Sequence, residues 1–110
     1  MNFTELKEQL KQSSLDQIRI DSHQAFECVF QTTQLEHIHQ VLHKYFGAPL
    51  KPAGKGPSQE AKKYASNYGG IRNDQTLYWA EKNEQSCLGM IWPWNDKTLA
   101  TLKLFHIEGK

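Results

Sequence analysis

The chain has 110 residues, of which 38% are hydrophobic and 23% are charged, and its formal net charge is +1. This length suits one domain with a single core, and so apolar a composition excludes a disordered chain. The small net charge argues against a protein built chiefly to coat nucleic acid.

The first predicted element is an amphipathic helix over residues 2–12. Asn2 can cap its start, and Glu5 follows at the spacing of a capping box. Three apolar side chains then fall on one helix face: Phe3, Leu6 and Leu10.

The next segment, residues 15–21, is ambiguous. Its apolar residues alternate imperfectly with polar ones, so it can be a further helical turn or a short strand. From Ala25 to Gln31 the pattern has period two, with Phe26, Cys28 and Phe30 on one side. We predict the first clear strand there.

A second helix is predicted over residues 33–46. Thr33 and Glu36 have the spacing of a capping box, and Gly47 stands at the end of the pattern. A continuous apolar stripe supports this helix: Leu35, Ile38, Val41, Leu42, Tyr45 and Phe46.

Glycine, proline and lysine dominate residues 47–57, a composition that neither a helix nor a strand tolerates. We expect a mobile loop there. A short helix over residues 58–66 should follow, with Ser58 as its N-cap.

Three candidate strands complete the chain, over residues 76–81, 86–92 and 99–107. Their short polar connections favour an antiparallel meander, since parallel neighbours need long crossovers. We therefore predict a single α+β domain spanning residues 1–110. Its antiparallel sheet would have about four strands, one strand and then the C-terminal meander, with helices packed on one face.

The cellular location is predicted from the absence of a membrane segment and of an export signal. No stretch approaches the length of apolar residues that a membrane helix needs, and the first residues carry no export pattern. Cys28 and Cys87 lie in separate apolar segments, so we expect two buried, reduced thiols. We expect a cytoplasmic protein without a membrane partner.

Charge is distributed unevenly. The segment from Lys44 to Arg72 contains six cationic residues and one acidic residue, Glu60. Its net charge is therefore +5, and that of the remainder is −4. Glycine-rich backbone, a helix start and lysines together suit a phosphate or carboxylate group. The spacing is not that of a phosphate-binding loop, and a solvated loop with lysines kept for solubility explains the same residues.

Aromatic residues gather in the C-terminal half, at Tyr78, Trp79, Trp92 and Trp94. Pro93 cannot donate to a sheet ladder, so the strand must bulge, end or lie at an edge there. The indoles could line a groove or close the end of the core. The predicted ligand-binding residues are Lys51, Lys55, Lys62, Lys63, Tyr64, Tyr68, Arg72, Trp79 and Trp94.

No catalytic residue, metal site or cofactor is predicted. His39 and His43 are one helical turn apart, but they lack the glutamate of a zinc-protease helix, so we interpret them as border histidines. No serine elbow accompanies the two cysteines, and the carboxylates lie at turns.

Our leading functional hypothesis is a non-enzymatic binding module for an anionic small molecule or an acidic protein surface. A second is a small enzyme for a phosphorylated or carboxylated metabolite, with His39 or His43 as acid or base. A third is single-stranded nucleic-acid binding through lysines and stacked aromatics. A fourth is a homodimer that pairs a strand edge or buries Trp94.

Overall fold

The computed structural model describes residues 1–82 and 84–108. Its centre is a five-stranded sheet in the order β1-β2-β5-β4-β3, in which every neighbouring pair is antiparallel. The strands are β1 (Gln17–Asp21), β2 (Ala25–Gln31), β3 (Thr76–Lys82), β4 (Gln85–Pro93) and β5 (Leu99–Glu108). The helices are α1 (Phe3–Lys11), α2 (Leu35–Phe46) and α3 (Gln59–Ala65), with a 3₁₀ turn over Thr32–Gln34.

The predicted α+β class and the β3-β4-β5 meander are confirmed, but the predicted strand count was too low. The ambiguous segment after α1 forms β1, which pairs with β2. Every residue of β1 is exposed and the register shifts between Ile18 and Ile20, so the segment carries no regular alternation. The Ser22 hydroxyl accepts the backbone N–H groups of Gln24 and Ala25, which shapes the turn into β2.

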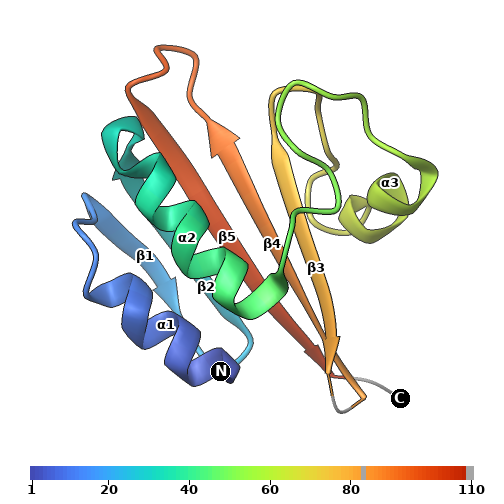
Figure 1. Ribbon diagram of the computed structural model, residues 1–110, viewed down its shortest axis with the longest axis horizontal. Helices are drawn as coiled ribbons and strands as arrows, with labels where there is room; N and C mark the ends of the chain where they lie inside the picture. The colour runs from blue at the N-terminus through green and yellow to red at the C-terminus, as the bar shows by residue number, and fades with distance from the viewer. Residues whose placement is uncertain (83, 109–110) are drawn as a thin grey trace.

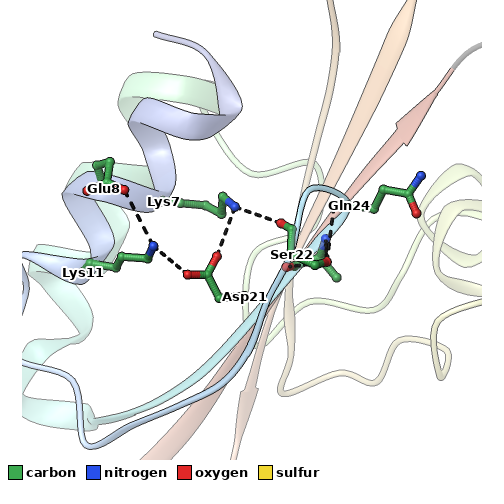
Figure 2. Close-up of polar contacts among 7 residues, drawn as sticks. Lys7, Glu8, Lys11, Asp21, Ser22 and Gln24 are labelled. Atoms are coloured by element: carbon green, nitrogen blue, oxygen red, sulfur yellow. Dashed lines mark hydrogen bonds and ion pairs between the residues drawn. The ribbon is translucent and has the colours of Figure 1, made fainter.

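Helices α1 and α2 lie side by side over one side of the sheet (Figure 1). We call this side the helix-pair face. The capping box of Asn2 and Glu5 is present, as predicted. Figure 2 shows how α1 is tied to the β1–β2 hairpin: Asp21 lies 3.1 Å from Lys7 Nζ and 2.6 Å from Lys11 Nζ.

Helix α2 ends at Gly47, whose φ of 77° is a conformation that suits glycine. Its start differs from the prediction. The N-cap is Gln34, which makes no side-chain cap, so the expected capping box of Thr33 and Glu36 does not form. The neighbouring Thr32 hydroxyl donates instead to the carbonyl of Lys97, so the 3₁₀ turn is joined to the β4–β5 connection.

Helix α3 corrects the prediction that all helices share one face. Its buried residues Ala61 and Ala65 pack with Leu77, Leu88 and Met90, which alternate with the residues that face α1 and α2. Small alanine side chains let the short helix approach this second side of the sheet, the α3 face. The Ser58 hydroxyl accepts the N–H of Ala61, so the predicted cap is confirmed.

The larger core lies under the helix pair. Cys28 and Cys87 are buried within it as free thiols, as predicted, and burial raises the pKa of each to about 12. Gly89 of β4 lies under the Phe46 ring, where a Cβ would come within 3.2 Å of the ring. Within the described part of the chain, no helix is long and apolar enough to span a membrane.

Candidate aromatic and cationic binding face

Two of the predicted binding residues, Tyr64 and Trp79, fasten α3 to the sheet. Their rings stack with centroids 3.7 Å apart and an interplanar angle of 3°. The indole N–H of Trp79 donates to the Glu81 carboxylate at 3.0 Å. Both rings are only partly exposed. They therefore form one wall of the α3 face, with their flat surfaces already in contact.

Tyr68 follows α3 and packs on β5. Its ring centroid lies 4.4 Å from that of Phe105, and the two residues share a shallow cavity of about 350 Å³. The next residue, Gly69, has a φ of 98° and lies against the Trp92 ring. A Cβ there would come within 2.6 Å of Trp92, so the close approach of this loop requires glycine.

Lys51 is buried, in contrast to its predicted role as a solvent-facing anion contact. Its ammonium donates to the carbonyls of Gln75 and Asn73, the latter at 2.6 Å, and its backbone forms a bridge with Leu77. Burial lowers the pKa of Lys51. With 2% of its surface exposed, this lysine joins two loops and has no room for a ligand.

The other predicted lysines are exposed to solvent, whereas Lys51 is buried. Lys62 and Lys63 lie in the last turn of α3, and Lys55 lies in the exposed loop before it. They can contribute long-range positive potential to the α3 side of the molecule.

Arg72 and Trp94 do come together. They line one open pocket of about 550 Å³ with Pro93, Asn95 and Asp96, which we call the arginine–tryptophan pocket. The Trp94 indole N–H donates to the Thr101 hydroxyl at 2.9 Å, which fixes the ring. Arg72 Nε lies 3.7 Å from an Asp74 oxygen, and 68% of the Arg72 side chain is exposed. An ion pair this exposed holds its arginine weakly.

The carboxylate inside this pocket is already engaged. Asp96 Oδ1 accepts the backbone N–H of Thr98 at 3.0 Å, and this hydrogen bond lowers the pKa of Asp96. Asp96 therefore shapes the turn between β4 and β5. Pro93 is the last residue of β4, so of the three predicted outcomes, a bulge, an end or an edge, the strand end is the one observed.

Beside the pocket, two cations each lie over one indole ring. Arg19 Cζ lies 5.8 Å from the Trp94 ring, and Lys103 Nζ lies 3.8 Å from the Trp92 ring. Glu27 lies between the two cations, 3.7 Å from Arg19 and 3.9 Å from Lys103. Arg19 and Lys103 were not among the predicted binding residues. The alternation of β5, which places Lys103 with Thr101 and Phe105, could have indicated the second of them.

His39 and His43 lie away from these groups, on α2. His39 Nδ1 is 2.5 Å from the hydroxyl of Tyr78, whose ring belongs to the core beneath α2. Burial lowers the pKa of His39, with the neighbouring His43 as a smaller cause, and burial raises the pKa of Tyr78 to about 12. The imidazole of His39 and the phenol of Tyr78 therefore share a hydrogen bond as neutral groups, and its direction depends on the imidazole tautomer.

The sheet separates these histidines from α3 and its lysines, so the structure does not bring together the residues of the enzyme hypothesis. Among residues 1–82 and 84–108, no group of three or more His, Cys, Asp and Glu side chains is placed to hold a metal ion.

Comparisons with known proteins found no matching family, no matching curated protein and no matching solved structure.

Proposed function

We propose that this protein is a binding module that holds an acidic segment of a partner protein on its α3 face. The observation that carries the proposal is the convergence of Arg72 and Trp94 in one open pocket. Tryptophan and arginine are the residue types that most often dominate binding energy at protein interfaces. An exposed guanidinium can form bidentate hydrogen bonds with a carboxylate, and a fixed indole beside it adds apolar contact area.

The surrounding charges favour an acidic partner. Glu27 is engaged by Arg19 and Lys103, and Asp96 is engaged by the backbone of its own turn. The exposed lysines of α3 and its preceding loop, Lys55, Lys62 and Lys63, extend the positive potential beyond the pocket. Such a field speeds association with an acidic segment and makes binding weaken as salt rises. The proposal needs no catalytic step.

The test uses fluorescein-labelled hexaglutamate as the probe and hexalysine as its opposite, measured by fluorescence anisotropy in about 50 mM salt. Hexaglutamate should bind and hexalysine should not. Arg72→Gln should weaken binding about tenfold, because it removes a charged hydrogen-bonding partner. Trp94→Ala should weaken it as well. Lys44→Gln makes the same loss of charge on exposed α2 and should leave binding within about twofold of the wild type.

Equal effects of Arg72→Gln and Lys44→Gln would reject the arginine–tryptophan pocket as the site. Equal binding of the two probes would reject an acidic partner altogether.

A second candidate is self-association through β1, and it is favoured by the exposure of Ile18 and Ile20 on an edge strand. Sedimentation equilibrium from about 5 µM to about 500 µM should then show a dimer that Ile20→Lys abolishes. Leu50→Lys, at another exposed apolar residue outside β1, is the matched control. A monomer over the whole range would reject this candidate.

A further inference from the structure

A second cavity, larger than the arginine–tryptophan pocket, lies at the opposite end of the sheet. Its volume is about 680 Å³, within the range of small-molecule sites. Its lining residues come from the start of α1, the turn between β1 and β2, the last turn of α2, the ends of β3 and β5 and the start of β4. The cavity therefore draws its walls from segments far apart in the sequence.

The charged side chains that line this cavity are two lysines, Lys7 and Lys82, and no aspartate or glutamate lines it. His23 and His106 add two imidazole rings to the lining. Lys82 Nζ donates to the carbonyl of Tyr45 at 2.9 Å and lies 3.9 Å from the Tyr45 ring centroid. Both of these partners are uncharged, so they do not neutralise the positive charge of Lys82. An anion is the ligand that such a lining would stabilise.

Lys7 differs from Lys82 because a carboxylate outside the lining already holds it. Figure 2 shows its ammonium between Asp21, at 3.1 Å, and the carbonyl of Ser22, at 2.8 Å. These contacts fix the β1–β2 turn against α1 and so keep one wall of the cavity in position. Of the two lysines, Lys82 is therefore the one whose charge can interact with an anionic ligand.

Aromatic rings supply the apolar part of the lining. The Phe3 and His106 rings stack with centroids 4.9 Å apart and an interplanar angle of 14°. His106 Nε2 lies 2.9 Å from Gln85 Oε1, which fixes the imidazole ring. Tyr45 adds a third, largely buried ring. Flat apolar walls beside a cation suit a ligand with a flat apolar body and one anionic group.

We propose that this cavity binds a small organic anion, an aromatic carboxylate or phosphate, with Lys82 as its principal charged contact. The site is separate from the acidic-segment surface, since β4 begins at the cavity with Gln85 and ends at the arginine–tryptophan pocket with Pro93. Either proposal can therefore fail without the other.

The test is a titration followed by ¹H–¹⁵N correlation spectra, with benzoate, phenyl phosphate and neutral benzamide as probes. Benzoate or phenyl phosphate should shift the amide signals of Phe3, Gln85 and His106, and benzamide should not. Lys82→Gln should weaken binding about fivefold, the effect of one solvent-accessible charge at contact distance. Lys82→Arg should retain it, and Lys44→Gln, outside the cavity, should leave it unchanged.

The spectra themselves report whether each variant is folded. Absence of shifts at these signals with both anions would overturn the proposal. So would equal binding of benzamide, or equal binding by the wild type and a folded Lys82→Gln. Lys82→Gln should also bind hexaglutamate as the wild type does, which separates this site from the α3 face.

Discussion

The Tyr64 ring lies flat on the Trp79 indole, with planes within 3° of parallel, and this contact joins α3 to β3. Helix α3 has only seven residues, too few to be stable alone in water. Its other buried contacts come from Ala61 and Ala65, whose side chains are small. The aromatic stack is therefore the largest side-chain contact that α3 makes through its own residues.

Replacing Tyr64 by alanine should lower the free energy of unfolding by about 1–3 kcal/mol, because both buried area and the ring–ring attraction are lost. Urea denaturation followed by tryptophan fluorescence measures this change. Tyr64→Phe keeps the stack and should cost less than about 0.5 kcal/mol. A loss in Tyr64→Phe as large as that in Tyr64→Ala would show that the hydroxyl group, and not the stack, holds the helix.

Replacing Lys51 by methionine should destabilise the protein by about 1–3 kcal/mol. The substitution keeps an apolar stem but leaves the Gln75 and Asn73 carbonyls without their ammonium donor. Lys55→Met, in the same loop but exposed, should change stability by less than about 0.5 kcal/mol. Chemical denaturation of the two variants side by side is the measurement. Equal midpoints would mean that the buried ammonium contributes nothing to joining the loops.

Local patterns predicted the elements whose side chains alternate between core and solvent. The β2 segment, the meander and the stripe of α2 were recognisable because one side of each is buried. β1 was not, because all five of its residues are exposed and its register shifts at Ile18. Its position depends on the Ser22 turn and on the ion pairs from Asp21 to α1, which join residues 10 or more positions apart.

The sites were harder to predict than the strands, since each depends on which segments become neighbours. Composition identified Arg72 and Trp94 as candidates, but it also suggested Lys51, which the fold buries. Lys103 meets Glu27 only because β5 inserts between β2 and β4, and no local signal encodes that order. The cavity around Lys82 and His106 depends on the same order, so composition alone gave no indication of it.

Gly69→Ala should destabilise the protein by about 1–3 kcal/mol, by two mechanisms that act together. The φ of 98° strains any residue with a Cβ, and the added carbon would lie 2.6 Å from the Trp92 ring. Thermal unfolding and the tryptophan emission spectrum should both shift. Gly56→Ala is the matched control, because its Cβ would meet nothing within 4 Å and its φ is not positive. An unchanged melting temperature in Gly69→Ala would show that the loop moves away freely.

Stability should fall as pH decreases below about 6.5, and His39 should account for part of that fall. Burial holds the pKa of His39 below 6.5 in the folded chain, whereas the unfolded chain regains the ordinary value. Between these two pKa values the unfolded state binds more protons, so its stabilisation by acid exceeds that of the native state. The contribution is fully present above pH 6.5 and is lost as pH falls through the folded pKa.

The measurement is the free energy of unfolding in urea at several pH values between 7.5 and 5. His39→Gln should flatten the dependence in this window, since glutamine does not titrate and so removes the buried group whose pKa burial lowers. Tyr78→Phe should cost about 1 kcal/mol at pH 7.5 through loss of the same bond. The lowered pKa values of Asp21 and Asp96 affect stability only at more acidic pH, below about 3.8. A slope in His39→Gln equal to that of the wild type would exclude His39 as the titrating group.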